Sequence, residues 1–348
     1  MSETPDPAAP PTASAVPGAG SGRPGTARPL VTIVEPDSLA PAGRLGAWLE
    51  GAGARVRTVR LWSGDPVPAL GELGGAMLLM GGVMSAHADS EHPWLPGVRA
   101  LLRDAIDAGL PVLGVCLGAQ VAAEALVGRT AVPSPEGSEE GVVELLLEDA
   151  AEEDPLLGPA VRAGLGATAS LPEGTRGRGP ASGTAAQDGG VTGKAHVGGE
   201  APAAGPATVP ATDAVVGPCP ALAVGGPRLP VIVLHDDAVA ALPATARLLA
   251  STAQVRVHAW RAGSLLALQH HPEADPDHVA FWAARGVARR LGLLDDPALA
   301  HGAPAAALPE PVRAAAGAAR ERAEAIEPVT TAFGRALAAA IVEAARGL

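Results

Sequence analysis

Short apolar runs rich in β-branched residues alternate with segments of helical periodicity, and this alternation constrains the fold more than any other feature. Five runs are expected to form buried strands: 30–34 (LVTIV), 56–61, 76–80 (AMLLM), 111–115 (PVLGV) and 229–234 (LPVIVL). Amphipathic helices are expected at 43–53, 95–108, 118–126 and 276–291. Strands and helices that alternate at this spacing form α/β folds. The sequence therefore predicts a mostly parallel central sheet with helices on both faces.

The second half of the chain follows this order less regularly. Residues 142–147 indicate a further strand, and 254–258 and 264–268 are expected to form a hairpin around 261–263. From Pro309 the chain is rich in Ala with Arg and Glu, which favours one or two helices, with a break near Pro328.

Composition divides the chain into three regions. Residues 1–28 contain mainly Pro, Ala, Gly, Ser and Thr without hydrophobic periodicity, which is typical of a disordered tail. One domain is expected over 29–292, interrupted by a low-complexity insertion at about 158–228, because structureless loops of that length are rare within a compact core. Residues 293–348 are expected to form a helical C-terminal extension.

Charge and residue usage exclude several classes of function. The net charge of −12 repels phosphate backbones, so nucleic acid is not expected as a partner. No apolar run reaches the roughly 18–20 residues that span a bilayer, and no signal peptide is evident, so a cytoplasmic protein without membrane contact is expected. The two cysteines, Cys116 and Cys219, do not form a disulfide framework. The histidines His87, His92 and His235 are too scattered along the sequence to predict a metal site.

Cys116 stands where a buried strand is expected to run into a helix, in the segment GVCLGAQ. Gly114 and Gly118 would allow the sharp turn that presents a nucleophile at the end of a strand. The partial positive charge of the following helix N-terminus favours a thiolate, and the N–H of Leu117 is placed to stabilise an oxyanion. The competing interpretation is a buried, inert cysteine.

The segment QHHPE offers a base for such a thiol. His271 and Glu273 are two residues apart, so in an extended chain both side chains project to one side, and the carboxylate can orient the imidazole. Neighbouring residues in a strand point to opposite faces, so His270 is expected to pack in the core. The alternative is an ordinary surface turn.

A third segment, MGGVMS, places Gly81 and Gly82 directly after an expected strand. Two glycines allow the backbone to approach a ligand closely, and the N–H of Gly82 would complete an oxyanion hole with that of Leu117. An ordinary turn at the end of a strand is the alternative.

The order of these three segments resembles the class I, or triad, glutamine amidotransferases. GVCLGAQ and QHHPE match the family pattern, and the chain is similar to stand-alone members that are like the amidotransferase domain of GMP synthase. The resemblance covers about 30–150 and 229–292, and it implies the flavodoxin-like fold of that family. Two positions depart from the family pattern: Val83 replaces a usual Pro, and His270 replaces a usual aromatic residue.

The resemblance also implies a reaction. Cys116 would attack the side-chain amide of L-glutamine, with His271 as acid and base, Glu273 as its orienting group, and the oxyanion held by Gly82 and Leu117. Gln120 and Gly81 would bind the substrate. The family implies no cofactor and no metal, and it implies ammonia transfer to a synthase subunit. The chain contains no ATP-binding motif, so that subunit would act in trans.

Two other functions remain open at this point. A hydrolase of γ-glutamyl amides or peptides would use the same triad, and the better substrate would distinguish it from a glutaminase. A catalytically degenerate scaffold protein would show no reaction between Cys116 and a glutamine-derived electrophile.

Overall fold

The computed structural model describes residues 28–171, 226–294 and 308–347. A nine-stranded mixed sheet runs through these residues in the order β2-β1-β3-β4-β11-β10-β9-β6-β7. Its parallel half contains β2 (Arg55–Arg60), β1 (Leu30–Glu35), β3 (Ala76–Leu79), β4 (Val112–Val115) and β11 (Leu265–Leu268). Its antiparallel half adds β10 (Ala259–Ala262), β9 (Arg247–Ser251), β6 (Glu139–Leu147) and β7 (Arg228–His235).

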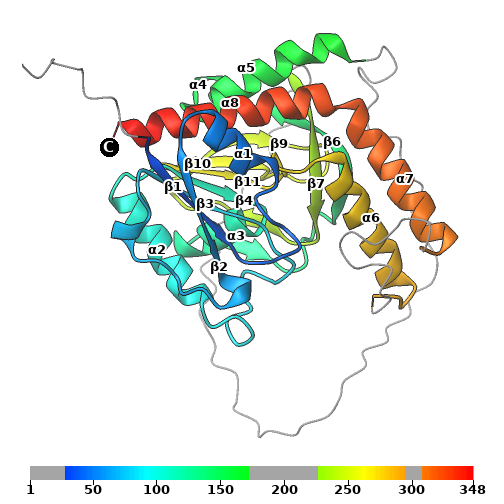
Figure 1. Cartoon of the computed structure of the whole chain (residues 1–348), viewed down its shortest axis with the longest axis horizontal. Helices are drawn as coiled ribbons and strands as arrows, with labels where there is room; N and C mark the ends of the chain where they lie inside the picture. The colour runs from blue at the N-terminus through cyan, green and yellow to red at the C-terminus, as the bar shows by residue number, and fades with distance from the viewer. Residues whose placement is uncertain (1–27, 172–225, 295–307, 348) are drawn as a thin grey trace, which may run out of the picture.

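Helices cover both faces of the sheet, which confirms the predicted fold class (Figure 1). One face packs against α1 (Arg44–Gly51), α5 (Leu157–Ala167) and α8 (Glu327–Arg346). The other face packs against α2 (Leu95–Asp107) and α3 (Leu117–Ala125). The pair α6 (Pro276–Arg290) and α7 (Glu310–Ala325) lies beside the β6–β7 end.

The smaller elements lie between these layers. The strands β5 (Arg129–Ala131) and β8 (Ala238–Ala241) form a separate antiparallel pair. The short helix α4 (Asp149–Glu153) follows β6, and single 3₁₀ turns occupy Leu61–Ser63, Leu70–Glu72 and Thr168–Ser170.

The C-terminal helices share the core of the sheet. The predicted break is confirmed: α7 ends at Ala325 and α8 begins at Glu327. Val329, Phe333, Leu337 and Ile341 recur every fourth residue, so they form one buried stripe on α8 that packs against the sheet and α1. A Cβ at Gly334 would lie 2.1 Å from Trp48 Cζ3, so this close helix contact requires glycine.

The predicted hairpin strand at 254–258 is wrong. The strand is β10, which pairs with β11 across the two-residue turn Gly263–Ser264, and residues 254–258 form the loop between β9 and β10. In this loop the N–H of Val255 donates to Thr252 Oγ1, and the N–H of Thr252 donates to the Val255 carbonyl. A side-chain turn of this kind competes with strand pairing, so the alternating apolar residues Val255 and Val257 lie in a loop and do not form a strand.

The low-complexity segment begins later than predicted. Residues 158–171, expected to belong to the insertion, form α5 and a 3₁₀ turn. Several glycines concealed the helical period, and one of them, Gly164, is needed because a Cβ there would lie 2.8 Å from Leu229 Cδ1. The remaining part, 172–225, and nearly all of the predicted N-terminal tail lie outside the described residues.

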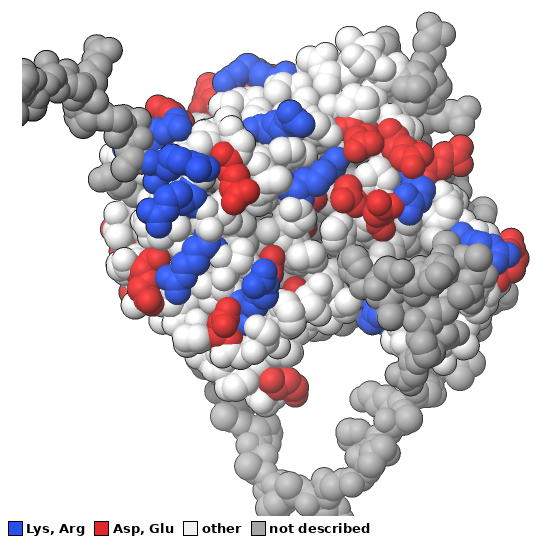
Figure 2. Space-filling model, viewed as in Figure 1, with Lys and Arg blue, Asp and Glu red and all other residues white. Residues whose placement is uncertain are grey.

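Charged side chains of both signs cover the face in Figure 2, with basic groups towards β2 and acidic groups towards α6 and α7. Arg55, Arg57 and Arg60 are exposed on β2, an edge strand, where charge discourages pairing with a further strand. Among the described residues, no single helix is long and apolar enough to cross a membrane, whereas the bent pair α7 and α8 meets that test together.

Candidate active site

Cys116 lies at the turn between β4 and α3, as the sequence predicts. Its backbone has φ 51° and ψ −109°, a conformation that is strained for a residue other than glycine. The turn is tight, because a Cβ at Gly118 would lie 2.1 Å from the Leu79 carbonyl oxygen. In this conformation the Cys116 side chain lies at the carboxyl end of β4 and at the N-terminus of α3.

The Cys116 sulfur, in a residue that is 6% exposed, has two described hydrogen-bond partners. The thiol lies 3.7 Å from the Leu234 carbonyl oxygen on β7, and the Gln269 amide nitrogen donates to the sulfur from 3.6 Å. Sequence reasoning did not assign a role to Gln269, although it stands at the start of the QHHPE segment.

His271 and Glu273 are buried and form a direct pair. The imidazole Nδ1 lies 2.7 Å from Glu273 Oε1, and Nε2 has no hydrogen-bond partner among the described residues. Burial lowers the pKa of His271, but the charges of Glu273 and Cys116 outweigh it and raise the pKa well above its usual value. An imidazolium is therefore stabilised between a carboxylate and the sulfur.

The N-terminus of α1 anchors the backbone around Glu273. The N–H of Arg44 donates to the Glu273 carbonyl at 3.2 Å, and the Arg44 side chain donates to the Ala274 carbonyl at 2.5 Å. A Cβ at Gly43 would lie 2.6 Å from the Glu273 carbonyl oxygen, so the approach requires glycine. His271 is anchored from β7, because its N–H donates to the Ile232 carbonyl.

The diglycine loop lies against the side chains of both Cys116 and His271. A Cβ at Gly81 would lie 3.5 Å from His271 Cε1 and 3.6 Å from Cys116 Cβ. The N–H groups of Gly82 and Leu117 donate no hydrogen bond to another described residue. Both donors therefore remain available for a developing negative charge.

Asp37 fixes the diglycine loop, a role that the sequence did not indicate. Its carboxylate accepts hydrogen bonds from the N–H of Val83 and the N–H of Leu39, both at 2.9 Å. A proline at position 83 has no N–H and could not make this bond. Val83, which replaces the usual proline of the family pattern, therefore makes a hydrogen bond to Asp37 that proline could not make.

Gln120 is buried beneath the site. Its amide nitrogen donates to the Asp237 carbonyl at 2.9 Å and lies 3.3 Å from Gln269 Oε1. The side chain therefore supports Gln269, which in turn contacts Cys116. Contact between Gln120 and a substrate remains a prediction.

His270 packs in the core, as expected. Its ring stacks on His258 at 5.6 Å and meets Phe333 of α8 edge-on at 5.7 Å. Burial lowers the pKa of His270 well below its usual value, and the nearby His258 and His271 act in the same direction.

A second cluster of titratable side chains lies beside these residues. Glu139, His235 and His258 offer one possible metal-ligand atom each, all within 4.8 Å of one another. Glu139 lies 96 positions from His235 and still further from His258 along the chain, and the scattered histidines of the sequence gave no sign that two of them meet.

Comparison with known proteins gives a consistent result. The family described as glutamine amidotransferase class-I matches residues 72–279. A glutamine amido transferase from Methylobacillus flagellatus is similar in structure, with a TM-score of 0.57, 19% identity, and coverage of 90% of this chain and 94% of that one. A glutamine amidotransferase from Thermotoga maritima has a TM-score of 0.56, 14% identity, and coverage of 90% and 98%. No curated protein sequence matches.

Proposed function

Because the chain belongs to the class I glutamine amidotransferase family, we propose that it hydrolyses the side-chain amide of L-glutamine through a γ-glutamyl thioester on Cys116. The observation that carries the proposal is the arrangement of His271. Its Nδ1 is held by Glu273, while Nε2 makes no hydrogen bond within the described part of the chain and the imidazole is electrostatically coupled to Cys116.

In the first half of the proposed reaction, the Cys116 thiolate attacks the side-chain carbonyl carbon of glutamine. The carbonyl oxygen becomes an oxyanion, which accepts hydrogen bonds from the N–H groups of Gly82 and Leu117. The C–N bond then breaks, and His271 gives its proton to the departing nitrogen, so ammonia leaves and the thioester remains.

In the second half, neutral His271 takes a proton from water, and the resulting hydroxide attacks the thioester carbonyl carbon. The C–S bond breaks, glutamate leaves, and the Cys116 thiolate and the His271 imidazolium are restored. Glu273 keeps the proton of Nδ1 in place throughout, so Nε2 is always the nitrogen that faces the reacting atoms.

Substrate binding and the use of ammonia extend the proposal. Gly81 lies between Cys116 and His271, where the substrate carbonyl would pass. Gln120 would contact glutamine through its own side-chain oxygen, because its amide nitrogen already donates to the Asp237 carbonyl. No cofactor takes part in these steps. We further propose a synthase subunit in trans as the ammonia acceptor and a cytoplasmic location, since the thiol of Cys116 must stay reduced.

The direct test is the release of glutamate and ammonia from L-glutamine by the full chain, in parallel with a γ-glutamyl amide such as γ-glutamyl-p-nitroanilide. We expect the two products in equal amounts and a higher kcat/KM for glutamine. A higher kcat/KM for the γ-glutamyl amide would instead assign the chain to γ-glutamyl hydrolysis, with the same triad.

A further inference from the structure

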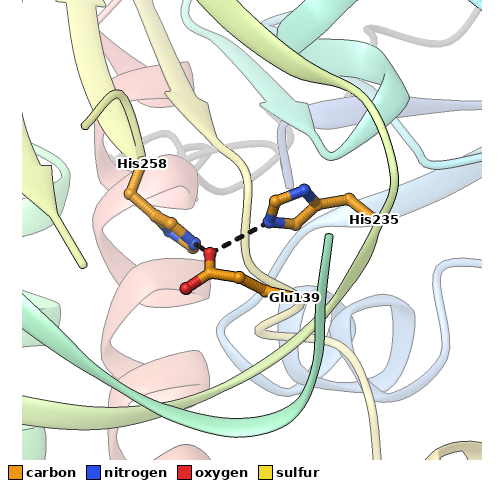
Figure 3. Close-up of side chains that lie close together, drawn as sticks. All are labelled: Glu139, His235 and His258. Atoms are coloured by element: carbon orange, nitrogen blue, oxygen red, sulfur yellow. Dashed lines mark hydrogen bonds and ion pairs between the residues drawn. The ribbon is translucent and has the colours of Figure 1, made fainter. Parts of the chain in front are cut away.

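The buried carboxylate of Glu139 joins three segments of the chain, and Figure 3 shows it with His235 and His258. Glu139, at the start of β6, has Oε2 3.1 Å from Nε2 of His235 and 3.3 Å from Nε2 of His258. Its other oxygen, Oε1, accepts a hydrogen bond from Thr252 Oγ1 at 2.7 Å. All four residues are buried. The carboxylate therefore holds the end of β7 and both ends of the loop 252–258.

The cluster could bind a metal, or it could be a joint in which Glu139 holds His235, His258 and Thr252 by direct contacts. The surroundings of Nδ1 in the two histidines distinguish these possibilities. The spacing of the three ligand atoms would suit a divalent ion, but a metal-bound Nε2 leaves a proton on Nδ1, which then needs an acceptor. Nδ1 of His235 and Nδ1 of His258 are buried and have no hydrogen-bond partner among the described residues. The tautomer with the proton on Nε2 fits His235 better, because its ring then donates to Glu139 and a bare lone pair is left at Nδ1. Nε2 of His258 lies 3.3 Å from the same carboxylate oxygen, in contact but without the geometry of a hydrogen bond.

Glu139 is ionised at neutral pH. Burial raises its pKa, but the hydrogen bonds from His235 and Thr252 and the contact with His258 outweigh burial and lower the pKa to about 2. A charged acceptor strengthens hydrogen bonds in a buried environment. The joint is therefore a strong connection between segments that are far apart in the sequence.

Both segments held by Glu139 reach the Cys116 sulfur. His235 follows Leu234, whose carbonyl oxygen lies 3.7 Å from the sulfur. The carbonyl of His258 accepts the N–H of Gln269 at 2.8 Å, and the side chain of Gln269 donates to the sulfur. Leu234 is thus the chain neighbour of His235, and Gln269 is hydrogen-bonded to His258, so both described partners of Cys116 are connected directly to the joint.

We propose that Glu139 is a positioning residue for Cys116, which holds in place the two groups that contact its sulfur. The inference rests on the proposed function for its effect on turnover, but not for its effect on the chemical reactivity of the thiol. Glu139 itself touches neither the substrate nor the reacting atoms.

The test compares Glu139→Gln and Glu139→Leu in the full chain, with Glu140→Leu, the exposed neighbour on the same strand, as the control. In Glu139→Gln the amide oxygen still accepts from His235 and keeps its contact with His258, and the amide nitrogen donates to Thr252 Oγ1, so most activity is retained. In Glu139→Leu His235 loses its acceptor and His258 loses its contact with an oxygen. We expect kcat for glutamine to fall about 10²-fold, as for a small displacement of reacting groups, while KM changes less than about twofold.

A second readout does not require turnover. Alkylation of Cys116 by iodoacetamide, followed across pH by peptide mass spectrometry, is expected to slow and to change its pH profile in Glu139→Leu but not in Glu139→Gln or Glu140→Leu. If wild-type protein does not hydrolyse glutamine, the proposed function fails while this comparison still tests the role of Glu139. If Glu139→Leu does not fold, Thr252→Val weakens the same joint and is expected to slow alkylation in the same sense.

Two results would overturn the proposal. The first is alkylation and turnover in folded Glu139→Leu or Thr252→Val equal to those of wild type. The second is one tightly bound Zn²⁺ per wild-type chain, measured by metal analysis after dialysis against zinc sulfate, that Glu139→Gln and Glu139→Leu both lose while Cys116→Ala retains it. That second result would assign the cluster to a metal instead.

Discussion

Cys116→Ala is expected to lower glutamine turnover by a factor on the order of 10⁴ or more, because the proposed thioester forms on the sulfur that this substitution removes. The substitution removes one atom from a side chain that is already buried, so the fold is expected to remain intact. Glutamate release, measured with enzyme-coupled detection at saturating L-glutamine, reports the effect.

The chain provides its own control for this substitution. Cys219 is the only other cysteine, and it lies outside the described residues. Cys219→Ala is expected to keep full turnover. Comparable loss in the two variants, or residual activity in Cys116→Ala within about tenfold of wild type, would contradict the assignment of the nucleophile.

Glu273→Gln is expected to lower kcat roughly 10²- to 10⁴-fold while changing KM little. The amide cannot hold the proton on Nδ1 of His271 as a carboxylate does, so the imidazole loses its tautomer and its charge partner. The nearby carboxylate Asp277, exposed on α6, offers the control Asp277→Asn, which should keep wild-type activity.

The pH dependence of kcat/KM distinguishes loss of the Glu273 charge beside His271 from a general loss of structure in Glu273→Gln. The pKa of His271 is raised well above its usual value, with the charge of Glu273 the leading cause that opposes burial. The proton that His271 gives to ammonia is present below this pKa and is lost as pH rises through it, so activity declines on the alkaline side. Without the charge of Glu273 the pKa of His271 falls, and the alkaline limb of kcat/KM should move to lower pH. An unchanged alkaline limb would argue against His271 as the acid.

Local signals in the sequence were sufficient to predict the parallel half of the sheet and the strand-to-helix turn at Cys116. Runs such as LVTIV and AMLLM are buried on both faces, so burial and strand propensity agree there. The turn at Cys116 needs small residues at fixed positions, and Gly118 is visible as such in the sequence. The pair His271 and Glu273 was predicted from an extended chain, and that reason was wrong: Pro272 and Glu273 lie in a turn in which the N–H of Ala274 donates to the His271 carbonyl, and the two side chains meet within it.

The antiparallel half and α5 were harder to predict, for physical reasons. Strand β9 (RLLAS) is a short run without clear alternation, and the side-chain turn at Thr252 removes the following apolar residues from the sheet. In α5, Gly158 and Gly164 stand where a Cβ would clash with neighbouring atoms, and such glycines weaken the helical signal.

The residues that support the candidate site could not be predicted at all from local patterns. Asp37 lies 46 residues from the backbone N–H that it holds, and Glu139 lies 96 residues from His235. Such contacts arise only when the strands assemble, and a carboxylate in a turn or at a strand end gives no sign of its distant partner.

The most direct test of the central claim is to trap the nucleophile in wild-type protein with a diazoketone analogue of L-glutamine. The thiolate displaces dinitrogen from the protonated analogue, and a stable thioether forms. We expect one adduct per chain on the peptide that contains Cys116, with labelling slowed by excess L-glutamine and absent in Cys116→Ala. An unlabelled Cys116, or labelling of Cys116 that L-glutamine does not slow, would contradict the proposal that this cysteine is the nucleophile of a glutamine-hydrolysing site.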